Sequence, residues 1–347
     1  MKKVLGALTL ATVTFGSAQV QAEDRWTANL YFENDLFTGT DLNYTNGVRL
    51  SFISPDVDSF LTKREDAYPW VNRLNKLLKA IHPSPPKKGS QQVQRNMILS
   101  TGQLMFTPTD RERETVDPND RPYAGWLYGG IGYQARVDDR LHSVELNIGV
   151  VGPWAKAKEA QDFIHAERNI ALFQGWDNQL ENELGLQLVF ERKRRFQITD
   201  EALWGVIDMD FINHWGGSIG NVSSYFNAGG EFRIGYRLPN DFGVSTLRPG
   251  GDNSAPGLGN PLDRDWHVYG FMATDVRLVA NNIFLDGNTF RESHSVDKEY
   301  VVGDAALGVA VIYERWKLSY SHVFRSKEFK QQQEGQSYGS VSLSYSF

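Results

Sequence analysis

The chain ends in the stretch GSVSLSYSF, residues 339–347, in which apolar and small polar residues alternate without a break. Val341, Leu343, Tyr345 and Phe347 fall on one face of an extended strand, and the serines fall on the other. Successive side chains of a strand point to opposite faces, so this period of two is typical of a β-strand with one apolar face. The terminal aromatic residue also resembles the signal that the outer-membrane barrel assembly machinery recognises.

The same alternation recurs along the chain, with charged residues on the second face of SSYFNAGGEFRIGYRL (223–238), HSVELNIGVV (142–151) and RWKLSYSHVF (315–324). Charges facing the core of a soluble β-sandwich would be costly unless paired, whereas a polar barrel lumen accepts them. We therefore predict an all-β fold, a transmembrane antiparallel β-barrel of about twelve strands with short helices in long extracellular loops. The strands are expected near residues 25–33, 45–54, 94–105, 124–136, 140–151, 182–194, 203–214, 222–237, 265–279, 299–313, 315–326 and 338–347.

Residues 1–22 are expected to be a secretory signal peptide, with a basic start (MKK), a short apolar segment and a small-residue cleavage motif ending at Ala22. Its removal would change the net charge from −6 to −8, because Lys2 and Lys3 are lost. The remaining residues, 23–347, show no linker or change in composition, so we expect one barrel domain in the outer membrane of a Gram-negative bacterium.

Composition excludes several classes of protein. The chain has no cysteine, and hence neither disulfides nor a thiol nucleophile. A mildly acidic chain does not suggest a nucleic-acid partner, and no apolar run after residue 22 is long enough for a transmembrane helix. There is no G-x-S-x-G motif, no P-loop and no zinc-ligand spacing. The outer membrane itself is the expected partner, and we expect a monomer.

Three connections are long, at residues 55–92, 106–123 and 152–181, and long loops are expected on the outside of such barrels. The first contains RLNKLLKAI (73–81), and the third contains AKAKEAQDFIHAERNIAL (155–172), both candidate helices. The two interfacial aromatic girdles are expected to draw on Trp126, Tyr128, Trp204, Trp215, Trp266 and Trp316.

Two residues of the second predicted helix are candidates for chemistry. Gln161 and His165 are four residues apart, so they share one face of a helix. Histidine exchanges protons near neutral pH, which suits a general base. The alternative is an ordinary surface histidine on a loop helix.

A second candidate group lies in FENDLFTGTDLNYTNG (32–47), where strand-like alternation gives way to polar residues. Asn34, Asp35 and Thr45 would meet at the top of the first hairpin. Carboxylate, amide and hydroxyl oxygens are ligands that Ca²⁺ prefers, so these residues are candidate metal ligands. The same residue types are also common in turns, and a plain loop is the alternative.

Several motifs give the chain a resemblance to the outer-membrane lipid A 3′-O-deacylases. They are ENDLF, TDLNYTNGVRLSF, MFTPTD, DRPYAGWLYGG, VGPWAKAKEAQDFIH, GWDNQLENE, NIFLDGNTFRESHSV and EFKQQQEGQSYGSVSLSYSF. The resemblance implies a twelve-stranded barrel with its active site near the outer leaflet. It further implies a calcium-dependent ester hydrolase that removes the 3′-linked acyloxyacyl group of lipid A from lipopolysaccharide.

The resemblance also implies residue roles. Asn34 and Asp35 match the family's Asn–Asp pair, and Thr45 matches a threonine or serine of its second strand; with Ca²⁺ they would polarise the ester. His165 matches the catalytic base, and Gln161 would orient the water or donate to the oxyanion.

The chain departs from the family pattern at two places. Where a characterised relative has a glutamate six residues after the histidine, this chain has Ala171. The basic residues expected to bind lipid A phosphates correspond only loosely to Arg111 and Arg113.

Two other functions stay open. An outer-membrane phospholipase would be expected to use a Ser–His pair on the barrel wall. The candidate pairs are His142-Ser143 and His294-Ser295, and in each the two residues are adjacent in the sequence. Adjacent strand residues point to opposite faces, so neither pair fits well. A non-enzymatic channel or adhesin would explain the strands, but it would leave Asn34, Asp35, Gln161 and His165 without a shared role.

Overall fold

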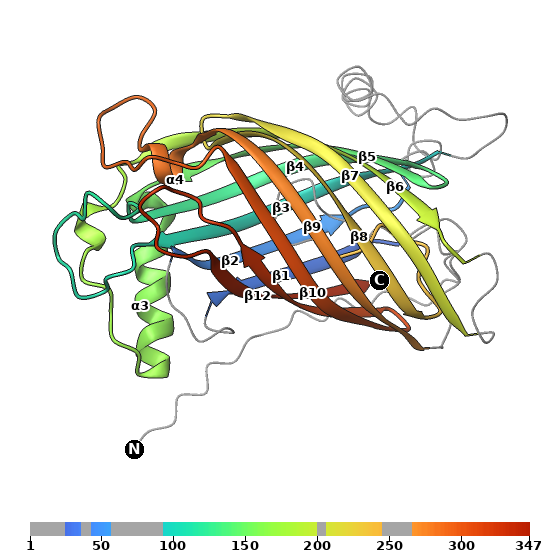
Figure 1. Ribbon diagram of the computed structural model, residues 1–347. Helices are drawn as coiled ribbons and strands as arrows, with labels where there is room; N and C mark the ends of the chain where they lie inside the picture. The colour runs from blue at the N-terminus through green and yellow to red at the C-terminus, as the bar shows by residue number, and fades with distance from the viewer. Residues whose placement is uncertain (1–24, 36–42, 57–92, 200–205, 245–265) are drawn as a thin grey trace.

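The computed structural model describes residues 25–35, 43–56, 93–199, 206–244 and 266–347. Twelve antiparallel strands pair with their neighbours in the chain, and β1 pairs with β12, so the sheet closes into a barrel (Figure 1). The strands are β1 Thr27–Asn34, β2 Asn43–Ile53, β3 Gln94–Thr107, β4 Ala124–Val137, β5 Arg140–Val151, β6 Glu183–Gln197, β7 Ile207–Gly220, β8 Ser223–Tyr236, β9 Trp266–Asn282, β10 Val301–Tyr313, β11 Trp316–Arg325 and β12 Gln336–Ser346. The predicted fold is confirmed.

The largest error in the predicted strands concerns β7, expected at 203–214 and found at Ile207–Gly220. Gly216 and Gly217 are turn signals, yet both lie inside this strand. A Cβ atom at Gly216 would lie 2.3 Å from the Phe190 carbonyl oxygen of β6. The glycine is therefore required by close approach of two strands rather than by a turn.

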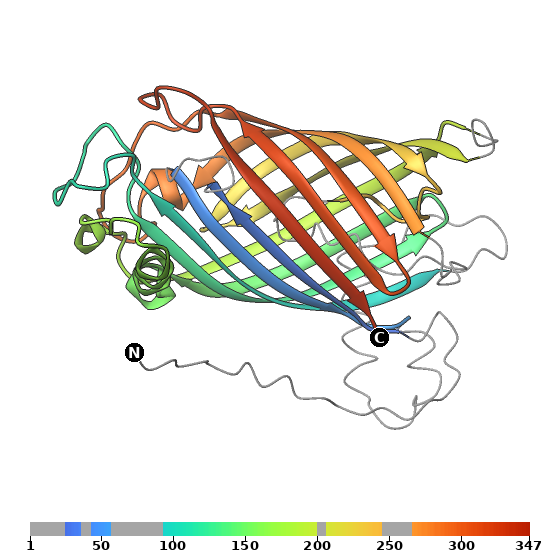
Figure 2. The ribbon, with the colours of Figure 1, turned by 90° about the horizontal axis from the view of Figure 1, so that it is seen from below.

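Short helices gather at one end of the barrel, opposite the ends of β1 and β12 where the chain enters and leaves it (Figures 1 and 2). These helices are η3 Pro153–Ala155, α3 Ala157–Arg168, η4 Trp176–Asn178 and α4 Ile283–Asp286. We call this end the outer rim and assign it to the extracellular side, where such barrels have their elaborated loops. None of the helices in the described ranges is long and apolar enough to cross a membrane.

One of the three connections predicted to be long begins and ends at the opposite end of the barrel from the outer rim. β2 ends at Ile53 and β3 begins at Gln94, both at the end opposite the outer rim, so the expectation of an extracellular connection at 55–92 is wrong. The candidate helix at 73–81 and the signal peptide at 1–22 fall outside the described residues.

The outer wall is apolar, because every second residue of most strands exposes a large hydrophobic side chain, such as Leu99, Ile131 or Leu146. Trp215, Trp266 and Trp316 are exposed on this wall, as expected of girdle residues.

The girdle prediction is wrong for two residues, and a third lies outside the described ranges. Trp126 and Tyr128 are only 1% and 2% exposed and stack inside the barrel, with ring centroids 4.3 Å apart. They alternate with Leu127, which faces outward. Trp204 is the residue that is not described.

The lumen is lined by charged side chains that pair across it. Arg49 donates to both carboxylate oxygens of Glu145, at 2.9 and 3.0 Å, and Ser100 donates to the same carboxylate. Arg49 and Glu145 come from β2 and β5, which are not neighbours, so this buried pair bridges the lumen. A polar lumen was predicted, but its charges are buried and compensated rather than simply hydrated.

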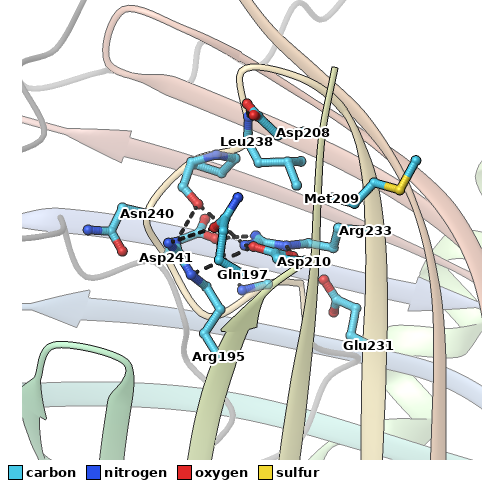
Figure 3. Close-up of polar contacts among 12 residues, drawn as sticks. Arg195, Gln197, Asp208, Met209, Asp210, Glu231, Arg233, Leu238, Asn240 and Asp241 are labelled. Carbon is cyan, nitrogen blue, oxygen red and sulfur yellow. Dashed lines mark hydrogen bonds and ion pairs between the residues drawn. The ribbon is translucent and has the colours of Figure 1, made fainter. Parts of the chain in front are cut away.

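A second network of ion pairs lies in the lumen near the end opposite the outer rim (Figure 3). Arg233 of β8 donates to both oxygens of Asp210 on β7, at 2.8 and 2.6 Å, and also pairs with Asp241. Asp241 lies in the segment after β8 and accepts a 2.6 Å bond from Lys317 of β11. This segment therefore spans the barrel interior, and charged groups hold it on two sides.

The lumen pair generates a stability prediction. Arg49→Ala leaves Glu145 buried without its bidentate partner and should destabilise the barrel by about 3–5 kcal/mol. The double variant Arg49→Leu/Glu145→Leu removes both charges and should recover most of that loss. Thermal unfolding followed by heat-modified gel migration measures both. Equal destabilisation in the single and double variants would mean that an unpaired buried charge does not cause the loss of stability.

Candidate active site

Helix α3 presents one face to the barrel. It follows Lys156, whose backbone is left-handed (φ 58°), and it ends at Asn169, also left-handed (φ 54°). Its buried residues are Ala157, Gln161 and His165, spaced four apart. The helix is shorter than the predicted 155–172, but Gln161 and His165 do share the face that packs inward, each only 2% exposed.

α3 lies against the outside of the barrel rather than in its lumen (Figure 2). A Cβ atom at Gly125 of β4 would lie 2.5 Å from the Ala157 Cβ, so the helix approaches the strand as closely as glycine allows. Gly125 is two residues from Leu127, which is exposed on the outer wall, and so faces the same way. Gln103 of β3 adds a 2.6 Å hydrogen bond to the Ala155 carbonyl.

The tautomer of the neutral His165 ring follows from its backbone contact. Its Nδ1 lies 2.8 Å from the carbonyl oxygen of Ala171. A carbonyl can only accept a hydrogen bond, so Nδ1 must donate, and in the neutral imidazole the lone pair is then on Nε2. The ring also packs beside Phe173, with centroids 5.8 Å apart. Position 171 therefore orients the histidine through its main chain.

The amide of Gln161 is oriented in the same way. Its Oε1 accepts a 2.7 Å hydrogen bond from the Trp176 indole. The indole nitrogen only donates, so the amide oxygen must face it and the amide nitrogen faces away. Within the described residues, Gln161 Nε2 is buried and has no acceptor. A donor is thus held ready for a ligand on the helix face that carries His165.

The first hairpin lies next to this helix on the same wall. Asn34 pairs with Asn46, and Asn46 with Met105 of β3. Met105 packs in one cluster with Ala157 of α3. Asn34 is in register with Asn46. Leu30, Phe32 and Asn34 are every second residue of β1, so their side chains share one face of the strand. Leu30 is exposed on the outer wall, and Asn34 therefore faces the outer wall too. The strand register thus brings the end of β1 to the outer wall beside α3.

Asp35 and Thr45 are the neighbours of this pair: Asp35 follows Asn34 in the chain, and Thr45 precedes Asn46. Asp35 follows β1 and is buried. Thr45 lies where the β2–β3 register shifts, and its hydroxyl is 2.7 Å from that of Thr107. Together with Asn34 these residues supply only hard oxygen donors, which fits Ca²⁺. No group of three or more His, Asp or Glu side chains in the described ranges could hold a metal, so such a site would rely mainly on neutral oxygens.

The two loop arginines differ in their surroundings. The Arg111 guanidinium lies 5.9 Å from the Phe173 ring centroid, next to the aromatic neighbour of His165. Arg113 instead pairs with Asp117 of its own loop at 2.8 Å. Of the two, Arg111 is the one seen to contact the aromatic ring that packs beside the candidate base.

Sequence reasoning missed the residues that orient the candidate pair. Phe173, Trp176 and Tyr123 pack together below α3. Burial raises the pKa of Tyr123 to about 12, so its phenol stays neutral and serves packing. The stretch GWDNQL, which contains Trp176, was among the resembling motifs, but nothing in one sequence pairs its indole with Gln161.

A closed barrel with an apolar outer face and a paired polar interior is an integral outer-membrane protein. The family model described as outer membrane protein LpxR matches residues 4–347, and the chain belongs to that family.

Among solved structures, LpxR from Salmonella typhimurium has a TM-score of 0.69 and 17% identity, covering 92% of this chain and 100% of that one. At this identity the likeness shows the fold. The β domain of the Bordetella autotransporter BrkA reaches a TM-score of 0.43 with 8% identity, covering 94% of this chain and 100% of its own. No curated protein matches.

The docking of α3 can be tested at its closest contact. Gly125→Ala places a Cβ against Ala157 and should loosen the helix, because overpacking costs about 1–3 kcal/mol. Limited proteolysis of the 152–182 connection should then accelerate by about tenfold. The matched control is Gly129→Ala on the same strand, where the nearest atom would be 3.9 Å away. Identical cleavage rates in both variants would show that this contact does not hold the helix.

Proposed function

We propose that this protein is a calcium-dependent outer-membrane hydrolase that removes the 3′-O-linked acyl (acyloxyacyl) group from lipid A of lipopolysaccharide. The observation that carries the proposal is the buried Gln161–His165 pair on the outer wall, with a donor at Gln161 Nε2 and a lone pair at His165 Nε2. Membership of the LpxR family supports the choice of substrate.

The position of the pair suits a lipid substrate. It lies outside the barrel at the outer rim, above a wall of exposed residues such as Leu99, Leu127 and Ile131. Acyl chains can stay beside that wall, in the hydrocarbon layer, while the ester reaches α3. A lumenal site would require the lipid to leave the membrane, at about 0.8 kcal/mol for each CH₂ group exposed to water.

The reaction needs one base and one oxyanion donor. His165 Nε2 takes a proton from a water molecule as its oxygen adds to the ester carbonyl carbon. Gln161 Nε2 donates to the carbonyl oxygen as negative charge develops there. The acyl C–O bond then breaks, the protonated His165 returns the proton to the departing sugar oxygen, and the products are a free fatty acid and a sugar hydroxyl.

The alanine at position 171, where a characterised relative has a glutamate, is compatible with His165 acting as the base. An acceptor on Nδ1–H orients the imidazole and stabilises the cation that forms during proton transfer. The Ala171 carbonyl occupies that position here. The carbonyl is neutral where the relative has a carboxylate, but it accepts from the same Nδ1–H, so the orientation of the ring is kept.

Ca²⁺ would be held by Asn34, Asp35 and Thr45, and when bound it would supply positive charge that polarises the ester carbonyl. Arg111 would attract an anionic group of the lipid A sugar, such as a phosphate, close to His165. Arg113 is a weaker candidate for the same role because Asp117 already compensates its charge.

The central test is mass spectrometry of lipid A from a deacylase-free Gram-negative host. Wild-type protein should remove one acyloxyacyl unit from lipid A in calcium-supplied membranes. His165→Ala should lower the rate by about 10²–10⁴-fold, the usual contribution of a general base. Phospholipids of the same membranes are analysed in parallel and should stay intact.

The matched control is His267→Ala, at the start of β9 and at the opposite end of the barrel, which should keep full activity. Both variants should migrate as folded, heat-modifiable barrels. Wild-type turnover by His165→Ala would remove His165 as the base. Release of fatty acid from phospholipids alone would move the proposal to a phospholipase.

A separate prediction concerns the metal. Asp35→Asn keeps the side-chain shape but removes the only carboxylate of the proposed ligand set, so the Ca²⁺ concentration for half-maximal activity should rise by at least tenfold. The control is Asp138→Asn in the β4–β5 turn, where φ is 47° and asparagine is well tolerated. Titration with buffered calcium measures the shift, and an unchanged response in Asp35→Asn would exclude this residue from the metal site.

A further inference from the structure

The segment that follows β8 is a loop inside the barrel. Residues 237–244 have no regular secondary structure, yet Pro239, Asp241, Phe242 and Gly243 are buried. In Figure 3 this segment lies among side chains of β6, β7 and β8. Connections normally run over a protein surface, because a buried loop has to satisfy its backbone polar groups internally. We call residues 237–244 the strap, and its presence in the lumen reduces the space through which solutes could pass.

The strap contacts strands on nearly opposite sides of the barrel. Asn240 accepts a 2.7 Å hydrogen bond from Arg136 of β4. Asp241 accepts a 2.6 Å bond from Lys317 of β11, and the same ammonium group donates to the Gly243 carbonyl at 3.1 Å. In the closed sheet, β4 and β11 are separated by several strands in both directions. The strap therefore crosses the lumen instead of following the wall beside β8.

Apolar side chains fill the space between these polar contacts. Phe242 packs with Leu141 of β5 and Ile212 of β7. Leu238 and Val244 pack against a cluster of buried residues from β9 and β10. The strap thus contacts the wall from β4 round to β11.

The rest of the wall, formed by β12, β1, β2 and β3, leaves little room of its own. Its inward side chains include Asn29, Ser51 and Ser342, which are small, yet none of them is more than 6% exposed. Arg49 of β2 also reaches across to Glu145 of β5. Small side chains around an open, water-filled channel would be exposed to it. Within the described residues, no wide channel therefore passes on this side.

An apolar layer fills the other mouth of the barrel, at the outer rim. Phe284 of α4 stacks on Phe106 of β3, with ring centroids 4.2 Å apart. Tyr44 of β2 packs edge-on against Tyr338 of β12, with centroids 5.1 Å apart. All four belong to one buried cluster, to which β4, β5, β10 and β11 also contribute. The rim end of the lumen thus has an apolar barrier as well.

A small cavity lies between the strap and this apolar layer. It is lined by Phe242 and Val244 of the strap, by Ala306 and Val323 of the layer, and by Ser321 of β11. It offers water about 50 Å³. A water molecule needs roughly 10–15 Å³ measured in this way, so the cavity has room for a few molecules. That is far less than the aqueous channel of a porin.

We propose that the strap closes the lumen to solutes, so that the barrel is a sealed scaffold and not a pore. The ion pairs of Asp241 with Arg233 and Lys317 hold the strap in place, and Phe242 anchors it through apolar contacts. This inference is independent of the proposed hydrolase activity. It excludes the channel that the strand pattern by itself leaves open.

The test measures whether a thiol inside the lumen can be reached from water. The chain has no cysteine, so Ser321→Cys introduces a single thiol into the cavity. In nanodiscs, a charged methanethiosulfonate should modify it about 100-fold or more slowly than Gln333→Cys, which is exposed at the rim. The reason is that the reagent has to wait for local opening of the strap. Mass spectrometry of the intact protein gives both rates.

Two strap variants are then made in the Ser321→Cys chain. Asp241→Lys places a third positive charge beside Arg233 and Lys317, which repels the strap from the wall. Phe242→Ala removes the apolar anchor without changing any charge. Each should speed modification of the thiol by at least about tenfold. Neither residue belongs to the barrel wall, so both proteins should still migrate as folded, heat-modifiable barrels.

The matched control is Asp139→Lys in the β4–β5 turn, at the same end of the barrel. It makes the same charge reversal and breaks a 2.8 Å ion pair with Arg194, but that pair is exposed, outside the lumen. The rate of thiol modification should therefore stay slow.

Three results would overturn the proposal. Rapid modification with the strap intact, or ion conductance of the wild-type protein in planar bilayers, would show that the lumen is open. Slow modification in both folded strap variants would show that the strap does not control access. Equal acceleration by Asp139→Lys would assign the effect to a general loosening of this end of the barrel.

Discussion

Pairing of the first strand with the last is the constraint on which the rest of this structure depends. β1 and β12 align from Thr27 with Ser346 to Asn34 with Gly339, which leaves the sheet without an edge. Inside hydrocarbon an unpaired backbone group costs several kcal/mol, so a membrane-spanning sheet has to close. Closure in turn divides every strand into one face towards lipid and one towards the lumen.

That division places the candidate pair, Gln161 and His165, on the outer wall. The lumen is crossed by buried pairs such as Arg49–Glu145 and Arg233–Asp210, whose charges are compensated in place. On the outer face, Gly125 lets α3 approach the barrel closely, and the helix then covers a patch of wall at the rim. The candidate base therefore lies outside the lumen at the outer rim, buried on the face of α3 that packs against the wall.

The local order around that base comes from groups that lie outside helix α3, in the connection that follows it. The main-chain carbonyl of Ala171 determines the tautomer of His165, and the indole of Trp176 determines which end of the Gln161 amide is presented. The spacing of Gln161 and His165 was visible as one helix turn, because i and i+4 residues share a face. Their orienting partners were not visible, because a hydrogen bond across a loop leaves no periodic signal.

By itself the sequence determined the twelve strands and the shared helix face of Gln161 and His165, since each is a local pattern with period 2 or about 3.6. It also showed the oxygen-rich end of β1, because the strand-like alternation stops there. Only the tertiary structure decided which face of each strand points to the lipid and which points to the lumen. Trp126 and Tyr128 alternate with Leu127, and alternation shows that two residues share a face without showing whether lipid or lumen lies beyond it. The register across β1, β2 and β3 that brings Asn34 beside α3 likewise exists only once the barrel has closed.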